Sequence, residues 1–391
     1  MTRSAASILL CLAACAAFAE EAPSASDRDP AAIAKGVELL LSMEEGENQG
    51  EWPYEGVYRV GGQIPIGYRV GGTGIVGVAL LEAPGLEEDV PRQQAIARAA
   101  TFVCSAVEHP LMRHKFSSTY DVRGWGYAYG AAFLARLVKH DRVPEALAET
   151  LPKAVEFYLQ GIAATEIPRY GGWNYARRAG FDKPGAQSPF MTGGTLQALF
   201  EIQAAGFEVD PGLVQRGLKS LEYTRAPNGA YVYAGIPSPR QPGEIPGAMG
   251  RMLVAEATLA LAGRGDEERI EKAIQAFVEH WDELDKRRAK NGTHKPPYGV
   301  APYYFYFAHH YAAQAIELLP EAKRPKYRAQ LREKLFSVQL ENGSWNDRVF
   351  PRTANFGTAF SVLALAMPEI TPPARWTKTA EPEEDESPED E

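Results

Sequence analysis

The chain has 391 residues, of which 45% are hydrophobic, so it is long enough to bury a large core. Its formal net charge is −9, and the sixteen residues from Trp376 to Glu391 alone hold eight acidic side chains against one lysine. The rest of the chain is close to neutral, and we therefore expect no nucleic-acid partner.

The N-terminus has the features of an export signal. An arginine precedes the apolar run Ala5 to Ala16, and Ala17-Phe18-Ala19 matches the cleavage pattern of secretory signal peptides. The run is too short for a permanent membrane anchor. In a second interpretation, Leu12-Ala13-Ala14-Cys15 is a bacterial lipoprotein box, and a lipid on its cysteine attaches the protein to a membrane. Both interpretations predict a periplasmic or secreted protein, with residues 1–19 as the signal peptide and residues 20–28 as a linker.

The cysteines and histidines do not form a recognisable motif. Cys11 and Cys15 lie in the signal peptide, which leaves Cys104 as the one cysteine of the mature chain and excludes a disulfide framework. Cys104 lies in an apolar helical stretch, where a buried structural thiol is the expected role. Because the sequence has no His-Glu-x-x-His motif, and no carboxylate cluster at metal-ligand spacing, we predict no metal site and no cofactor.

In chain order, the first predicted elements form a helical hairpin. A helix begins at Asp29-Pro30, an N-cap residue followed by proline at the first helical position, and apolar residues recur at helical spacing from Ile33 to Leu41. A long loop containing Gly50-Glu51-Trp52 follows, and we expect the second helix to start after Gly71-Gly72-Thr73. The glycine permits a tight turn, and the tryptophan is expected to fill the space between the helices.

Five further hairpins follow the same plan, with outer helices expected near Pro91, over Pro144 to Gln160, at Asp210-Pro211, over Glu267 to Asp285, and ending at Gln339. The fifth unit has no clear glycine–tryptophan pair. The corresponding segments before the inner helices are Arg123-Gly124-Trp125, Gly171-Gly172-Trp173, Asn228-Gly229-Ala230-Tyr231, Pro302-Tyr303-Tyr304-Phe305-Tyr306 and Gly343-Ser344-Trp345.

Six hairpins in residues 29–370 have a mean period of about 57 residues, and they predict a single all-α domain, an (α/α)6 toroid. Long loops connect each outer helix to its inner helix, and short turns lead back. We therefore expect all six inner helices to point the same way, with their N-termini and the long loops around one rim. The pattern stops after Pro368, and residues 371–391 are predicted to be a disordered acidic tail. We expect a monomer.

The repeats resemble those of the squalene-hopene cyclase and protein prenyltransferase β-subunit superfamily. Leu335-x3-Gln339 with Gly343-Ser344-Trp345 is similar to its QW repeat, and Gln160 with Gly172-Trp173 is a looser copy. The aromatic run from Pro302 to Tyr306 is more similar to exported bacterial members of unassigned activity. The resemblance covers roughly residues 29–370 and implies the toroid fold.

The catalytic motifs of these families are missing. Class II cyclases protonate their substrate with an Asp-x-Asp-Asp motif, whereas here Asp27-Arg28-Asp29 only precedes the first helix. The prenyltransferases bind zinc through Asp, Cys and His, and Cys104 is expected on an outer helix. The catalytic residues of the two families therefore have no counterparts in this chain.

The six long loops together contain eighteen Lys and Arg residues against eleven Asp and Glu residues. The positive ends of six inner-helix dipoles would add to the same rim. Both features favour an anionic ligand group, such as a carboxylate, sulfate or phosphate. The alternative is that the loops are simply polar.

Aromatic residues gather where the inner helices are expected to start, and tyrosine is preferred over phenylalanine, which favours a polar ligand such as a sugar. Core packing is the competing explanation for these rings. The predicted ligand-binding residues are Arg123, Trp125, Tyr127, Trp173, Asn174, Arg177, Arg251, Tyr303, Tyr306 and Arg348.

Four residues are candidates for catalysis, namely His309, Tyr304, Glu256 and Asp347. Each also has a structural explanation. His309 is adjacent to His310, and the two point about 100° apart on a helix, so only one of them can face a shared ligand. Glu256 and Asp347 each have a nearby arginine in the sequence, which suggests local ion pairs.

The sequence thus favours an exported toroid that binds a small-molecule or oligosaccharide ligand, expected to be anionic, in a central cavity. One alternative is a polysaccharide lyase or hydrolase on the same fold. A second is a terpenoid cyclase or transferase, which the missing acid motif disfavours.

Overall fold

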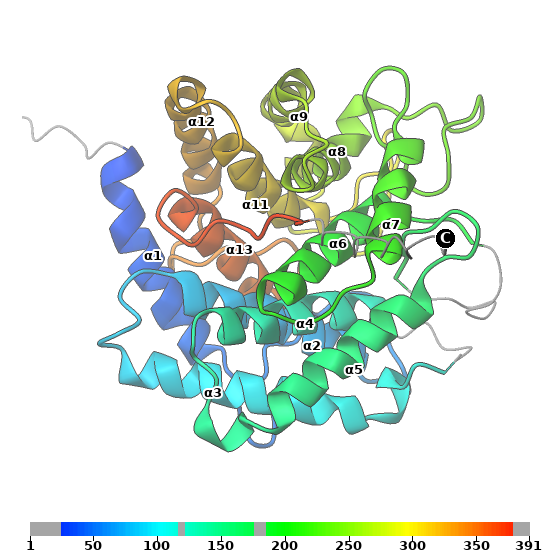
Figure 1. Ribbon diagram of the computed structural model, residues 1–391. Coiled ribbons are helices and arrows are strands. Elements are labelled where there is room, and N and C mark those ends of the chain that lie inside the picture. Colours follow the sequence, from blue (N-terminus) through cyan, green and yellow to red (C-terminus); the bar gives the residue numbers. More distant parts are fainter. Residues whose placement is uncertain (1–24, 116–121, 176–184, 378–391) are drawn as a thin grey trace, which may run out of the picture.

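The computed structural model describes residues 25–115, 122–175 and 185–377, and within these ranges it has helices but no strands. The helices form six consecutive hairpins (Figure 1). Their outer and inner helices are α1 (Ala25–Ser42) and α2 (Ile66–Glu82), α3 (Val90–Ser105) and α4 (Arg123–Lys139), α5 (Thr150–Thr165) and α6 (Pro189–Ala204), α7 (Pro211–Thr224) and α8 (Ile245–Leu261), α9 (Glu267–Glu279) with α10 (Trp281–Asp285) and α11 (Tyr304–Glu317), and α12 (Arg324–Ser337) and α13 (Ala354–Ala366). Short 3-10 helices in the connections are η1 (Ala106–Glu108), η2 (Pro110–Met112), η3 (Glu145–Leu147), η4 (Glu321–Lys323) and η5 (Pro351–Thr353).

The inner helices form a closed ring, which confirms the predicted (α/α)6 toroid. Going round the ring, α2 packs on α4, α4 on α6, α6 on α8, α8 on α11, α11 on α13, and α13 on α2 again. Each outer helix packs on the inner helix of the preceding hairpin, and α1 closes the outer layer by packing on α13 (Figure 1). Since the inner helices are covered on both sides, they are apolar nearly all round.

A tryptophan latch holds three of the hairpins together. The Trp52 indole N–H donates a hydrogen bond to Leu40 O at the end of α1 (2.7 Å), and the Trp52 backbone N–H donates to Thr73 Oγ1 inside α2 (2.9 Å). One fully buried residue thus ties the end of an outer helix to the next inner helix. The same pair of bonds links Trp173 to Ile162 and Thr192, and Trp345 to Leu335 and Thr358.

Glycines inside two of the inner helices allow the loop that carries the tryptophan to lie close to the helix. A Cβ atom on Gly72 would lie 2.3 Å from Trp52 O, and a Cβ on Gly357 would lie 2.4 Å from Trp345 O. Gly72 lies inside α2, so the prediction that this helix starts after Thr73 is wrong. The helix already begins at Ile66, and its glycines serve close packing rather than a turn.

Other boundaries also differ from prediction. The helix expected from Pro144 begins at Thr150, and the one expected over Glu267 to Asp285 breaks at His280 into α9 and α10. Trp125 was expected before its inner helix but lies within the first turn of α4, so the second hairpin lacks the latch. Helix α1 begins at Ala25 and therefore includes the end of the expected linker over residues 20–28. The signal peptide lies outside the described residues.

The chain after α13 forms a strap across the end of the ring. The Trp376 backbone N–H donates to Leu261 O at the end of α8, the Trp376 ring packs on Phe200, and Ala374 N donates to Glu201 Oε1. Residues 371–377 are therefore packed, and the expected disordered tail does not begin at residue 371, because buried Trp376 anchors the segment. Residues 378–391 lie outside the described ranges. No helix among the described residues is both long and apolar enough to cross a membrane.

Candidate functional site

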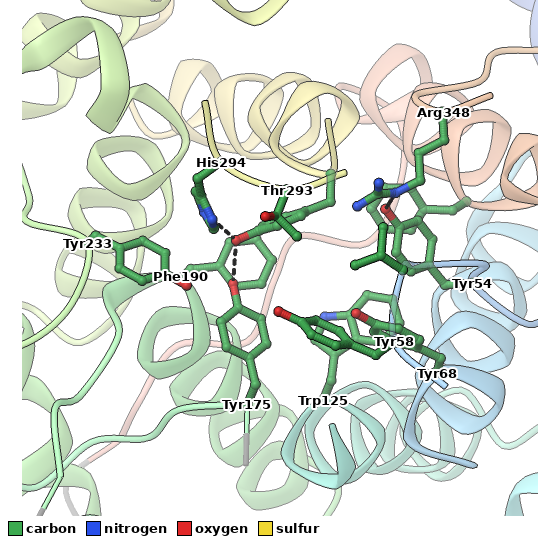
Figure 2. A pocket seen from close by; sticks show the side chains of 13 residues that line it. Tyr54, Tyr58, Tyr68, Trp125, Tyr175, Phe190, Tyr233, Thr293, His294 and Arg348 are labelled. Atoms are coloured by element: carbon green, nitrogen blue, oxygen red, sulfur yellow. Dashed lines mark hydrogen bonds between the residues drawn. The ribbon is translucent and has the colours of Figure 1, made fainter. Parts of the chain in front are cut away.

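A pocket lies on the axis of the toroid at the N-terminal ends of the inner helices (Figure 2). All six hairpins contribute to it, which confirms that their long loops and inner-helix starts meet around one opening. The cavity has a volume of about 30 Å³, enough for about two water molecules. This mouth pocket is lined by Tyr54, Val57, Tyr58, Tyr68, Trp125, Tyr175, Phe190, Tyr233, Thr293, His294, Tyr303, Arg348 and Phe356.

One wall of the mouth pocket is a hydrogen-bonded cluster of tyrosines around a histidine. The Tyr175 hydroxyl donates to the Tyr303 hydroxyl (2.9 Å), which in turn lies 3.1 Å from His294 Nε2. The Tyr233 ring packs edge-on against His294, with ring centroids 4.6 Å apart. Burial, together with three nearby arginines, lowers the pKa of His294 to about 4, so this imidazole is neutral at physiological pH.

The three arginines near His294 are Arg251, Arg287 and Arg348. Arg348 donates through Nε to the Tyr54 hydroxyl (2.7 Å) and through Nη1 to Gly292 O (2.8 Å). Arg251 donates to Tyr231 O and to the Tyr304 hydroxyl, and Arg287 donates to the carbonyls of Asn291 and Thr293.

None of these three guanidinium groups forms an ion pair with a carboxylate of the described residues. Burial and the charge of Arg348 lower the pKa of Arg287, as expected where like charges gather. By contrast, the buried Arg136 on α4 is paired with both Glu82 and Glu201. Among the described residues, Arg251 and Arg287 thus have no acidic partner and Arg348 has only the nearby charge of Asp347, so the mouth pocket carries an excess of positive charge.

An acid lies directly behind the pocket wall. Asp347 is fully buried, and its Oδ2 accepts a hydrogen bond from the Tyr54 hydroxyl (3.1 Å). Burial raises the pKa of Asp347 to about 6, and the positive charge of Arg348 limits the rise. Asp347 does not line the pocket, because the Tyr54 ring separates the two. Figure 2 shows Arg348 and Tyr54 on one side of the pocket and His294 on another.

Aromatic rings close the floor of the mouth pocket. Phe190 packs on Phe307 with ring centroids 4.2 Å apart, and Phe356 packs on Phe360 at 4.8 Å. Trp125 packs on Tyr129 in the same way, at 5.2 Å. The pocket therefore ends within the ring and does not run through it.

Below this floor lies a second cavity of about 80 Å³, which we call the lower chamber. It is lined by the C-terminal halves of inner helices and by the strap, including Ile370 and Pro373. Gln197 and Gln314 bond to each other across it, at 2.8 and 3.0 Å. The strap thus covers the end of the toroid opposite the mouth pocket.

The structure brings together some of the residues predicted from sequence. Trp125, Tyr303 and Arg348 line the mouth pocket. Arg251 and Tyr304 lie behind its wall and are bonded to each other, and Asp347 lies behind Tyr54. Arg177 lies outside the described residues.

The other predicted residues lie elsewhere, because each is used in packing or in hydrogen bonds to the backbone. The Tyr127 hydroxyl donates to Met112 O, Trp173 is part of a latch, and Tyr306 is buried away from the pocket. Arg123 bonds to the carbonyls of Arg113 and Lys115, and Asn174 bonds to Ala186 O.

Two of the candidates for catalysis have structural roles of this kind. The His309 Nδ1–H group donates to Phe305 O (2.7 Å), and His309 Nε2 accepts from the Trp281 indole N–H (2.9 Å). Both ring nitrogens are therefore occupied, and burial lowers the pKa of His309 to about 3. Glu256 accepts from the Tyr231 hydroxyl and lies near Arg225 and Arg269, outside the mouth pocket.

Sequence reasoning missed several pocket residues that a regular spacing marks. The residue two positions after each loop aromatic at Trp52, Trp173, Tyr231 and Trp345 lies at the mouth. Three of these positions, Tyr54, Tyr175 and Tyr233, line the pocket and were missed, and the fourth is Asp347, a predicted residue that lies behind the wall. Tyr58, Tyr68, Arg287 and His294 carry no comparable signal.

Nowhere in the described ranges do three or more His, Cys, Asp or Glu side chains gather as metal ligands. No family model and no curated protein matches the sequence.

Solved structures do match the fold. An inactive variant of the alpha-1,6-mannanase GH76A of Salegentibacter sp. HEL1_6, in complex with alpha-1,6-mannotetrose, has a TM-score of 0.58 and 12% identity, covering 87% of this chain and 99% of that one. The type II terpene cyclase MstE from Scytonema has a TM-score of 0.54 and 15% identity, covering 88% and 99%. An unsaturated glucuronyl hydrolase from Streptococcus agalactiae has a TM-score of 0.52 and 10% identity, covering 88% and 91%. At these identities the likeness shows the fold alone, and the chain is an α/α toroid like these enzymes.

Proposed function

We propose that the mouth pocket binds an acidic residue of a saccharide. The observation that carries this proposal is the gathering of Arg251, Arg287 and Arg348 around a pocket that no described carboxylate lines. Buried Asp347, behind Tyr54, offsets only part of their charge. Buried positive charge is costly unless it is compensated. A ligand carboxylate or sulfate would supply the missing charge and could accept a hydrogen bond from Arg348 Nη2, which has no partner among the described residues.

The other residues that line the pocket suit a sugar that carries the acidic group. The walls combine aromatic faces, on which a sugar ring can stack, with hydroxyl groups at their edges. Six tyrosines line the pocket, namely Tyr54, Tyr58, Tyr68, Tyr175, Tyr233 and Tyr303. Two proteins with the same fold have names that refer to saccharides. One is the mannanase in complex with mannotetrose, and the other is the unsaturated glucuronyl hydrolase.

Ligand entry requires aromatic side chains to move. The present cavity of about 30 Å³ is too small for a sugar residue. Tyr233 is 38% exposed at the entrance, and its loop contains Gly235 and Gly243 in left-handed conformations. Rotation of Tyr233 and its neighbour Tyr58 would open the pocket without disturbing the ring of helices.

The test is isothermal titration of the protein with D-glucuronate and with short oligouronates, using D-glucose as the neutral control. We expect the acidic sugars to bind and glucose to bind at least tenfold more weakly. Arg348→Gln should abolish this preference. Arg98→Gln is the matched control, because Arg98 is paired with Glu44 on the outer surface. Equal binding of glucuronate and glucose, or no binding of either, would contradict the proposal.

A second candidate function is elimination at a uronate residue, and the neutral His294 favours it. A neutral imidazole can take the proton from the carbon beside the sugar carboxylate. The electron pair then forms a C=C bond as the glycosidic C–O bond breaks, and a tyrosine hydroxyl such as Tyr303 protonates the leaving oxygen. Arginines would stabilise the charge that develops on the carboxylate.

Incubation with polyuronates and detection of the unsaturated product by ultraviolet absorbance tests this candidate. Binding of uronates without product formation would contradict elimination and support a protein that only binds the sugar.

A hydrolase is less well supported, because two catalytic carboxylates are usual in glycosidases and no described carboxylate lines the pocket. A cyclase would need an acid facing the cavity, whereas Asp347 lies behind Tyr54.

We also propose that the protein is exported, on the strength of its N-terminal sequence. Purification of the mature protein from the native cell and determination of its first residue test this directly. A start at Glu20 would indicate simple cleavage, and a lipidated start at Cys15 would indicate membrane attachment. An intact N-terminus would contradict export.

A further inference from the structure

A chain of three side chains leads from the mouth pocket into the protein. Arg348 Nε donates to the Tyr54 hydroxyl over 2.7 Å, and this hydroxyl donates to Asp347 Oδ2 over 3.1 Å. Asp347 is fully buried, and its Oδ1 has no hydrogen-bond partner among the described residues. Of these three residues, only Tyr54 and Arg348 line the pocket, so Asp347 can act on a ligand only through them.

The two protonation states of Asp347 present different pockets. An ionised carboxylate only accepts hydrogen bonds, so the Tyr54 proton must point to Asp347, and the negative charge weakens the field of Arg348. A protonated carboxyl group can instead donate to the Tyr54 oxygen. The Tyr54 proton is then free to turn toward the pocket, and Arg348 acts at full strength. Both changes favour an anion.

We infer that Asp347 is a positioning residue whose protonation strengthens anion binding in the mouth pocket by turning the Tyr54 hydroxyl and releasing the charge of Arg348. The inference rests on the proposed function, and it adds to that function a dependence on pH. By reciprocity, a bound anion must also favour the protonated form of Asp347.

The neighbouring groups keep their charge over the range in which Asp347 changes its own. Burial raises the pKa of Asp347 to about 6. The pKa of His294 is lowered to about 4, so it stays neutral above pH 5. Around Asp347, burial raises the pKa values of Tyr54, Tyr68 and Tyr306, and the nearby negative charge of Asp347 helps to raise the pKa of Arg348. The other arginines near the pocket are Arg251 and Arg287. The acids on adjoining segments are held in ion pairs, namely Asp285 with Arg288, Glu45 with Arg352 and Glu55 with Arg59.

The test measures the affinity of the full chain for D-glucuronate by titration calorimetry at pH 5.0, 6.0 and 7.5. We expect binding to weaken about tenfold from pH 5.0 to pH 7.5, with most of the change near pH 6. The Asp347→Asn variant, which cannot ionise, should bind at pH 7.5 as tightly as the unmodified protein binds at pH 5.0, and its affinity should not vary with pH.

Two further variants distinguish the effect of the Tyr54 hydroxyl from the effect of the charge of Asp347 on Arg348. Tyr54→Phe should bind more weakly at pH 5.0 yet keep part of the pH dependence, because the charge of Asp347 still acts on Arg348. Glu256→Gln is the matched control, since Glu256 is also buried and accepts a hydrogen bond from a tyrosine, at 2.9 Å, but lies outside the pocket. It should keep the full pH dependence.

An affinity that does not change between pH 5.0 and 7.5, or a pH dependence that persists in Asp347→Asn, would overturn the inference. Absence of glucuronate binding at every pH would contradict the proposed function instead. In that case, the difference infrared spectrum of the protein and its Asp347→Asn variant reports the carboxyl group directly. A protonated Asp347 band at pH 5.0 would support the inference, and an ionised group throughout would overturn it.

Discussion

Asp347 and Glu256 are both buried acids that accept a hydrogen bond from a tyrosine, but they differ in the number of arginines near them. Glu256 lies near two arginines, Arg225 and Arg269, which compensate its charge. Asp347 forms no salt bridge with an arginine of the described residues. Its Oδ2 accepts a hydrogen bond from Tyr54, Arg348 acts on it from nearby, and its Oδ1 has no hydrogen-bond partner in the described part of the chain. Burial of such an acid next to a pocket costs stability and fits a role in ligand binding.

Replacement of Asp347 by asparagine should therefore stabilise the protein at neutral pH. The folded-state pKa of about 6 lies above the usual 3.8, so the folded protein holds its proton longer than the unfolded chain, and stability falls as pH rises from 3.8 to 6. The difference corresponds to roughly 3 kcal/mol above pH 7. Urea unfolding should show a gain of up to this size for Asp347→Asn at pH 7.5 and about a third of it at pH 4.5. A loss of stability at pH 7.5 would mean that the ionised carboxylate is stabilising.

At the scale of helices and loops, the latch makes a separate prediction. Thr73→Val keeps the shape of the side chain but removes the oxygen to which the Trp52 backbone N–H donates. A buried N–H without a partner costs about 1–3 kcal/mol, so urea unfolding should show a loss of that order. Thr101→Val on α3 is the control, because Thr101 is exposed and bonds only within its own helix. Equal effects of the two substitutions would argue against the latch.

The hairpins were more predictable from the sequence than the pocket. Hairpins were predictable because Trp52, Trp173 and Trp345 repeat with glycines nearby, and the start of an inner helix was misplaced at Gly72 because a close approach and a turn both require glycine. The pocket was only partly predictable. Arg287 and His294 come from a loop without a repeat signal, and they meet Arg348 only after the ring closes, through contacts far apart in the chain.

For the whole molecule, the strap should contribute to stability but not to ligand binding. Ending the chain after Ile370 removes the packing of the Trp376 ring on Phe200. It also removes the hydrogen bond that the Ala374 backbone N–H donates to Glu201. Loss of a buried tryptophan of this size costs about 3 kcal/mol or more, so the truncated chain should unfold at lower urea concentration. Its affinity for glucuronate should remain that of the full chain, because the floor of aromatic rings separates the lower chamber from the mouth pocket. A strong loss of binding would show that the two ends are coupled.

Closure of six hairpins into one ring brings three arginines and a set of tyrosine rings to a single opening that no described carboxylate lines. The most direct test is a crystal structure of the protein with D-glucuronate bound. We predict the sugar in the mouth pocket, with its carboxylate within hydrogen-bond distance of Arg348 Nη2 and its ring against one of the aromatic faces. Glucuronate bound outside this pocket, or seated in it with the carboxylate turned away from all three arginines, would contradict the account.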